Sequence, residues 1–132
     1  MRRIGKKIVL GAVVALGLAG GAMADPVEGT WQTEVDDGAY AHVAMAPCGG
    51  AFCGTMVRTF NSGGEYKSPN IGKKLILDMV PQGDGTYKGK AWRPSNGKTY
   101  IGKMTLKGDT LYPAGCVLGG LLCFDQTWTR IK

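Results

Sequence analysis

Residues 96–109 read Asn-Gly-Lys-Thr-Tyr-Ile-Gly-Lys-Met-Thr-Leu-Lys-Gly-Asp, a run of alternating side chains between two turn signals. Tyr100, Met104 and Leu106 fall on one face of an extended chain, and the threonines and lysines between them fall mostly on the other. This period of two is typical of a β-strand with one buried and one solvated face. The Asn-Gly and Gly-Asp pairs suit tight hairpin turns. The stretch therefore predicts a strand over 98–106 with a hairpin at each end.

The same pattern of short apolar or alternating runs and turn signals continues along the chain beyond Ala24. Its spacing, about ten to thirteen residues, is typical of an all-β sandwich or barrel. The predicted strands cover residues 29–35, 40–47, 52–60, 73–80, 86–93, 98–106, 110–117 and 121–131. Because most connections are short, we expect a small eight-stranded up-and-down antiparallel barrel rather than a two-sheet sandwich. The longest irregular piece, Asn61 to Gly72, is interpreted as a loop or lid.

The last predicted strand, 121–131, has the same alternation as residues 98–106. Leu122, Phe124 and Trp128 lie on its expected apolar face, opposite polar residues between 125 and 129. We therefore expect one continuous strand whose apolar face turns into the barrel.

The first 24 residues have the three parts of a secretory signal peptide. Four basic residues up to Lys7 precede an apolar run from Ile8 to Ala19, and Ala22-Met23-Ala24 has the small-x-small cleavage pattern. The apolar run of about 12 residues is shorter than the roughly 20 that a membrane-spanning helix needs. No cysteine precedes Cys48 that could carry a lipoprotein anchor. We predict cleavage after Ala24 and a periplasmic or secreted protein with no membrane span in its mature part.

Removal of that segment changes the charge balance. The whole chain has a formal charge of +6, and residues 1–24 contribute +4 of it. The predicted mature chain therefore has a formal charge of +2. A nucleic-acid-binding domain needs clustered Lys and Arg on a strongly basic surface, so we expect no nucleic-acid partner. The remaining 108 residues of the 132 fit a single domain, 25–132.

Four cysteines lie in the predicted mature chain: Cys48, Cys53, Cys116 and Cys123. In an oxidising compartment an even number of cysteines indicates disulfides, and three pairings are possible. We favour Cys48–Cys53 and Cys116–Cys123 because each pair brackets a Gly-containing turn. The spacings differ from the C-x-x-C of redox or zinc sites, so structural bridges are preferred. With Gly119-Gly120 as a two-residue turn, the second pair would be a hydrogen-bonded pair with a Cα separation of roughly 5.5 Å.

Three further segments carry a family resemblance. They are residues 25–31 (DPVEGTW), 47–54 (PCGGAFCG) and 115–130, which contains GCVLGGLLC and QTWTR, with NIGKKLILDM at 70–79 between them. Together they resemble the bacterial secreted family catalogued as domain of unknown function 2147. The resemblance implies a calycin-like barrel and no activity. Asn61 to Gly72 is shorter than the polar stretch of many members, so a function residing in that stretch would be in doubt here.

The start and end of the domain are also similar to lipocalin-type barrels. Gly29-x-Trp31 opens the first strand, and Arg130 lies near the end of the last one. The resemblance implies that Trp31 plugs one end of the barrel and that Arg130 packs over it. Such a contact between a guanidinium and an indole contributes about 0.5–2 kcal/mol.

Catalytic and metal-binding signals are weak. His42 is the only histidine, and a general base or a metal ligand would need partners that the sequence does not place beside it. Asp78 interrupts an apolar strand; we expect it to face solvent or to pair with Arg58 or Arg93. Ser62, Ser68 and Ser95 lack the context of a nucleophile. We expect no catalytic residue, metal or cofactor.

The aromatic residues Trp92, Tyr100, Phe124 and Trp128 are candidate ligand-binding residues. An eight-stranded barrel is either filled by side chains or holds one small ligand, and these residues fit both. Three functions stay open: a module that binds a small apolar or amphipathic ligand, a structural module that docks an envelope protein, and an enzyme of unknown class. An exposed apolar patch would favour the second, and a pocket holding both His42 and Asp78 would favour the third.

Overall fold

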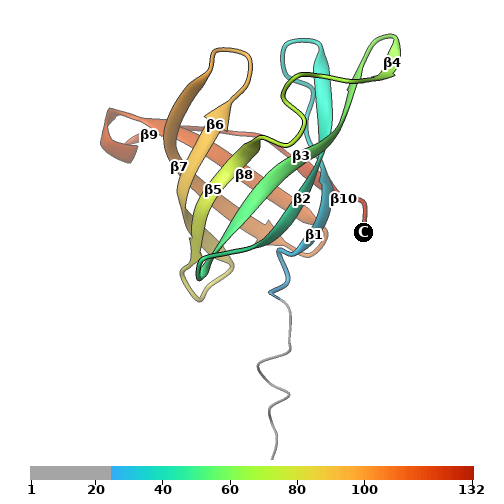
Figure 1. Ribbon diagram of the computed structural model, residues 1–132. Helices are drawn as coiled ribbons and strands as arrows, with labels where there is room; N and C mark the ends of the chain where they lie inside the picture. The colour runs from blue at the N-terminus through green and yellow to red at the C-terminus, as the bar shows by residue number, and fades with distance from the viewer. Residues whose placement is uncertain (1–24) are drawn as a thin grey trace, which may run out of the picture.

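The computed structural model describes residues 25–132, so the predicted signal peptide lies outside it. The chain forms a closed eight-stranded antiparallel barrel, as predicted, in which strands that follow each other in sequence lie side by side (Figure 1). The wall contains β1 (Gly29–Gln32), β2 (Ala39–Cys48), β3 (Ala51–Asn61), β5 (Lys74–Pro81), β6 (Thr86–Arg93), β7 (Lys98–Lys107) and β8 (Thr110–Val117). The eighth place is shared by β9 (Leu122–Asp125) and β10 (Trp128–Arg130). No helix within 25–132 is long and apolar enough to cross a membrane.

The last strand is interrupted, and here the expectation of one continuous strand is wrong. β10 pairs with both β8 and β1 and so closes the barrel, whereas β9 pairs with β8 alone. The main-chain N–H of Thr127 donates to the carboxylate of Glu34 instead of to a main-chain carbonyl of β1. Without a second neighbour, β9 extends away from the barrel, and Leu122 and Phe124 are exposed instead of buried (Figure 1).

The connection from Asn61 to Gly72 contains one short strand that the sequence did not indicate, β4 (Gly64–Tyr66), which pairs with the end of β3. The buried hydroxyl of Thr59 fixes the segment that follows: it donates to the carbonyl of Tyr66 and accepts from the N–H of Ser68 at 3.2 Å. The remainder of the connection is the expected loop, and it lies beside the open end of the barrel.

One half of the barrel is packed solid. Side chains that are 3% exposed or less fill it, and they are Val27, Trp31, Val43, Met45, Ile76, Met79, Tyr87, Met104 and Leu111. The N-terminal segment crosses this end of the barrel before β1 begins (Figure 1). The indole N–H of Trp31 donates to the carbonyl of Val27 at 2.9 Å, and the hydroxyl of Tyr87 donates to Asp25 at 2.6 Å. These contacts close this end of the barrel.

A β-bulge explains why Asp78 interrupts an apolar strand. The pairing of β5 with β6 shifts register between Leu77 and Val80, and Asp78 has a φ of 52° and an exposed side chain. Gly89 on β6 lies opposite, where a Cβ would approach the carbonyl oxygens of Asp78 and Leu77 to 2.5 and 2.6 Å. Asp78 thus serves the geometry of the bulge, and neither Arg58 nor Arg93 pairs with it.

Both disulfides have the favoured pairing, Cys48–Cys53 and Cys116–Cys123. The geometry of the second differs from the expectation. The turn between its cysteines is a four-residue loop that contains a short 3₁₀ segment, Leu118–Gly120, rather than the two residues Gly119-Gly120. The two Cα atoms are 4.0 Å apart, which is shorter than the expected spacing of roughly 5.5 Å.

Candidate functional site

The half of the barrel opposite the packed end contains a cavity of about 680 Å³. Its floor is formed by buried side chains of β2, β3, β5 and β10, namely Ala41, Met56, Thr59, Ile76 and Trp128. Its mouth lies between the β1–β2 turn, the β3–β5 connection, the β6–β7 turn and β9. Pockets of about 300–1,000 Å³ are the usual size for small-molecule sites, so the volume suits one small ligand.

Side-chain size explains why only one half of the barrel is open. The wall of the cavity includes five small residues, Ala39, Ala41, Ala91, Ala114 and Gly115. At the other end the corresponding space is filled by large side chains such as Met79, Met104 and Leu111. The interior of an eight-stranded barrel can be filled by side chains or can hold one small ligand. In this protein the packed core and the open pocket share the interior.

All four predicted ligand-binding residues border the cavity: Trp92, Tyr100, Phe124 and Trp128. Trp128 is 4% exposed and belongs to the floor, whereas Phe124 is 66% exposed and lies at the rim. The β6–β7 register pairs Tyr100 with Ala91 and Trp92 with Thr99. The side chain of Trp92 therefore lies on the opposite face of the sheet from those of Ala91 and Tyr100. The ammonium of Lys73 lies 5.6 Å from the Trp92 ring. Whether these residues bind a ligand stays a prediction.

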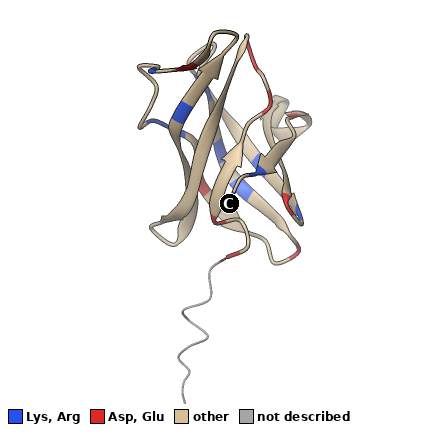
Figure 2. Ribbon diagram, turned by 90° about the vertical axis from the view of Figure 1, so that its right-hand side faces the viewer, with Lys and Arg blue, Asp and Glu red and all other residues tan. Residues whose placement is uncertain are grey.

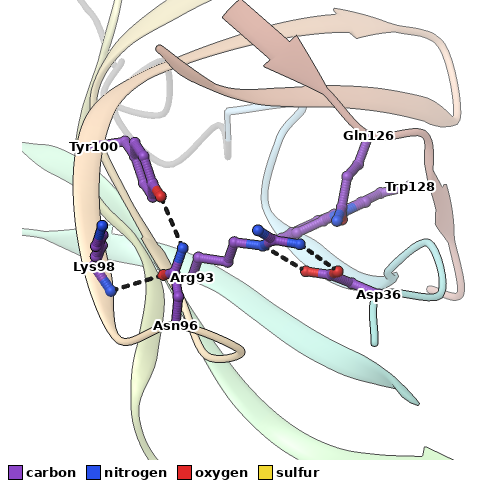
Figure 3. Close-up of polar contacts among 7 residues, drawn as sticks. All are labelled: Asp36, Arg93, Asn96, Lys98, Tyr100, Gln126 and Trp128. Carbon is purple, nitrogen blue, oxygen red and sulfur yellow. Dashed lines mark hydrogen bonds and ion pairs between the residues drawn. The ribbon is translucent and has the colours of Figure 1, made fainter. Parts of the chain in front are cut away.

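An ion pair spans the mouth. Arg93, at the end of β6, donates from Nε and Nη2 to the two carboxylate oxygens of Asp36, at 3.0 and 2.8 Å. Asp36 belongs to the β1–β2 turn, and β1 and β6 stand on opposite sides of the barrel. Figure 3 shows the arginine side chain extended toward Asp36. The hydrogen bond from Arg93 lowers the pKa of Asp36, and Asp36 raises the pKa of Arg93.

Three further hydrogen bonds lie near this ion pair. The side-chain amide of Asn96 donates to the hydroxyl of Tyr100 at 2.8 Å, and its oxygen accepts from the main-chain N–H of Lys98 (Figure 3). The indole N–H of the floor residue Trp128 donates to the side-chain oxygen of Gln126 at 2.8 Å. The sequence did not single out Asp36 or Gln126, although both stand next to strands that end at this side of the barrel.

At the packed end, Trp31 and Arg130 meet as the lipocalin resemblance implies. The guanidinium carbon lies 4.4 Å from the centroid of the indole ring. Arg130 also donates to the carbonyls of Glu28 and Pro26 and to the carboxylate of Asp109. It thereby ties the N-terminal segment to the last strand.

The two titratable candidates, His42 and Asp78, are separate from each other and from the cavity. His42 lies on the outer face of β2, where it contacts Gln32 at 3.1 Å and the ring of Phe60 at 4.7 Å. Burial and the charge of Arg58 lower the pKa of His42. Neither the cavity nor the small hollow lined by Thr105, Lys107, Tyr112 and Asp125 includes His42 or Asp78.

Asp78 lies close to the sulfurs of Cys48 and Cys53, with the potential ligand atoms within 4.8 Å of one another. The two sulfurs are bonded to each other and therefore offer no thiolate to a metal ion. This cluster is a disulfide beside an exposed carboxylate. Figure 2 shows both acidic and basic residues on the face of the barrel that it presents. Lys88 of β6 and Lys103 of β7 lie directly opposite each other in the sheet, and the expected absence of a nucleic-acid partner stays a prediction.

Comparison with known proteins agrees with this architecture. The model of a bacterial family described as "Uncharacterized protein conserved in bacteria (DUF2147)" matches residues 29–130. Among solved structures, the chain is similar to protein HP1028 of Helicobacter pylori, which is described as belonging to the lipocalin family. The two share 20% sequence identity with a TM-score of 0.62, over 80% of this chain and 83% of the other. A search of curated proteins gives no match.

Proposed function

From the premise that the chain belongs to the bacterial DUF2147 family, we propose that it is an exported carrier that binds one small apolar or amphipathic molecule inside its barrel. The observation that carries the proposal is the cavity of about 680 Å³ above a packed base, which the Cys48–Cys53 disulfide braces. The lipocalin-like fold is compatible with such binding. A preformed pocket favours affinity because little has to be ordered when the ligand arrives.

The apolar residues that line the cavity provide the expected driving force for ligand binding. An apolar ligand chain would contact Met56, Ile76 and Trp128, all of which are 5% exposed or less. Each 100 Å² of apolar surface removed from water would contribute about 2.5 kcal/mol before the costs of association are subtracted. Phe124, exposed at the rim, would gain the most burial from a bound ligand. Tyr100, which shares a face with Ala91, would complete the side wall.

Export is part of the proposal. Residues 1–24 would direct the chain across the inner membrane and be cleaved after Ala24, leaving 25–132 as one barrel domain in the periplasm or outside the cell. Two disulfides are compatible with an oxidising compartment. The bacterial distribution of the family is compatible with the same location.

Native mass spectrometry of the protein exported to a bacterial periplasm tests the carrier function. The denatured mass should equal that of 25–132 less four hydrogens for the two bridges. The native mass should exceed it by a discrete small molecule, or by an added fluorophore such as 1-aminoanthracene. A native mass equal to the denatured one, with no uptake of the fluorophore at any concentration, would refute the carrier function.

A cavity-filling variant tests the location of the site. Ala91→Phe places a ring in the cavity, whereas Ala46→Phe places the same ring on the exposed face of β2. We expect the first to abolish uptake of the fluorophore and the second to leave it unchanged. Equal uptake by both variants would place binding outside the cavity.

A second function, docking of an envelope partner, is favoured by one observation. The β8–β9 hairpin has no charged residue from Cys116 to Phe124, and Leu118 and Leu121 are 70% and 89% exposed. Exposed apolar patches often mark interaction sites. Cross-linking in the periplasm should then yield a partner that Leu118→Ser together with Leu121→Ser removes, while uptake of the fluorophore stays unchanged.

A further inference from the structure

The polar groups at the cavity mouth carry a surplus of unpaired hydrogen-bond donors. A guanidinium has five N–H groups that form two forks, each able to bind a carboxylate in a bidentate manner. Asp36 takes the fork made by Nε and Nη2 of Arg93. No side chain or carbonyl within 25–132 accepts from the other three N–H groups, so the second fork of Arg93 stays free at the edge of the cavity.

The neighbouring amides are oriented by groups that can only donate. The Trp128 indole is a donor, so the oxygen of Gln126 must face it, and the Gln126 NH₂ is left without an acceptor in the described chain. The main-chain N–H of Lys98 likewise fixes the oxygen of Asn96. The Asn96 NH₂ therefore donates to the hydroxyl of Tyr100, and the Tyr100 O–H is left to donate elsewhere.

The side-chain oxygens of the same groups each already accept a hydrogen bond. Both carboxylate oxygens of Asp36 accept from Arg93, and the side-chain oxygens of Gln126 and Asn96 each accept one hydrogen bond. Arg93, Tyr100 and Gln126 all border the cavity. These groups therefore offer unpaired donors, one set of them charged, above an apolar interior.

We propose that the ligand is a single-chain amphiphile with an anionic head group, whose oxygens bind the free fork of Arg93 and the donors of Tyr100 and Gln126 while its apolar chain fills the cavity. This inference rests on the proposed carrier function and specifies its ligand class. A carboxylate and a phosphate ester share the required chemistry, because both present several acceptor oxygens with negative charge.

Two other carboxylates border the cavity and define the competing hypothesis. Glu34 accepts from the N–H of Thr127, and Asp125 also lines a small outer hollow with Lys107 and Tyr112. If these acidic residues dominated the mouth, a cationic amphiphile would bind better than an anionic one. A matched ligand series separates the two cases.

The test measures displacement of 1-aminoanthracene by decanoate, decanol and decylammonium, which share a chain length and differ in head group. We expect decanoate to bind roughly tenfold more tightly than decanol, because a hydrogen bond to a charged group is stronger than one to a neutral group and Arg93 is partly solvated. Arg93→Gln should abolish the preference for decanoate and leave decanol unchanged. Rising ionic strength should weaken decanoate alone.

Arg58→Gln is the matched control. Arg58 makes the same bidentate contact with Glu65 and is similarly exposed, 53% against 49% for Arg93, but it does not border the cavity. This variant should keep the preference for decanoate. Should Arg93→Gln fail to fold, Tyr100→Phe and the ionic-strength dependence test the same donors.

Each outcome of this test supports or overturns the anionic head group. Equal binding of decanoate and decanol, or tighter binding of decylammonium, would overturn the anionic head group while leaving the carrier function intact. A preference for decanoate that survives in Arg93→Gln would also overturn it. Failure of all three ligands and of the fluorophore to bind would contradict the carrier function itself.

Discussion

Removal of the Arg130 side chain should destabilise the barrel far more than removal of a typical surface arginine. Arg130 packs over Trp31 at 4.4 Å and donates to the carbonyls of Glu28 and Pro26 and to the carboxylate of Asp109. It is 22% exposed, whereas Asp109 is 83% exposed. Arg130→Ala would therefore leave two carbonyl oxygens of the N-terminal segment without their charged donor and uncover an indole face.

The magnitude follows from these contacts. A hydrogen bond from a charged group contributes about 1.5–3 kcal/mol, and the guanidinium–indole contact contributes about 0.5–2 kcal/mol. The exposed pair with Asp109 adds about 0–1 kcal/mol. Because these contributions overlap and water reaches part of the site, we expect Arg130→Ala to lower the free energy of unfolding by about 3–5 kcal/mol.

Urea denaturation of the oxidised protein, followed by tryptophan fluorescence, measures this loss. Arg58→Ala is the control, since Arg58 makes a bidentate contact with Glu65 on the exposed side of β3 and should show little change. Arg130→Lys keeps the positive charge but lacks the several N–H groups of the guanidinium. Its loss in the free energy of unfolding should lie between those of the two alanine variants. If Arg130→Ala and Arg58→Ala unfold at the same urea concentration, the role assigned to Arg130 is wrong.

The remaining predictions concern the bridges, the bulge and the mouth. Cys48→Ala and Cys116→Ala should each lower the free energy of unfolding by about 2–5 kcal/mol in urea titrations, and unchanged midpoints in both would contradict structural bridges. Gly89→Ala should cost about 1–3 kcal/mol, because its Cβ would meet carbonyl oxygens at 2.5 and 2.6 Å; a thermal midpoint equal to wild type would refute that close approach. Arg93 lowers the pKa of Asp36 below 3.8, so their pair should stabilise the fold above that pH and lose its effect as the pH falls through the lowered pKa. The carboxyl of Asp36, followed by NMR, should titrate at a higher pH in Arg93→Gln, and an unchanged titration would exclude the arginine as the cause.

Local alternation was sufficient to predict the barrel, because its strands are joined by hairpins whose turn residues are explicit in the sequence. Residues 98–106 lie within β7, and both disulfides join cysteines that bracket one turn. The bulge at Asp78 was not predicted. A positive φ at a residue other than glycine depends on the strand opposite, where Gly89 leaves the space.

The interruption between β9 and β10 shows a second limit of sequence reasoning. Alternation places Phe124 and Trp128 on one face, but burial depends on whether a neighbouring strand continues beside them. β1 ends at Gln32, which pairs with Thr129, so Trp128 lies next to the closed part of the wall and is buried, while Phe124 lies beyond the end of β1 and is exposed. The small residues Ala39, Ala41 and Ala91 are the sequence signal that could have located the cavity.

The most direct test of the central claim is an NMR titration of the protein labelled at its methionine methyl groups, with decanoate as ligand. Met56 lines the cavity, whereas Met79 and Met104 lie in the packed half of the barrel. The account predicts a saturating shift of the Met56 methyl resonance, with Met79 and Met104 nearly unchanged. Saturable binding of decanoate that leaves the Met56 resonance unmoved would contradict a ligand inside the barrel.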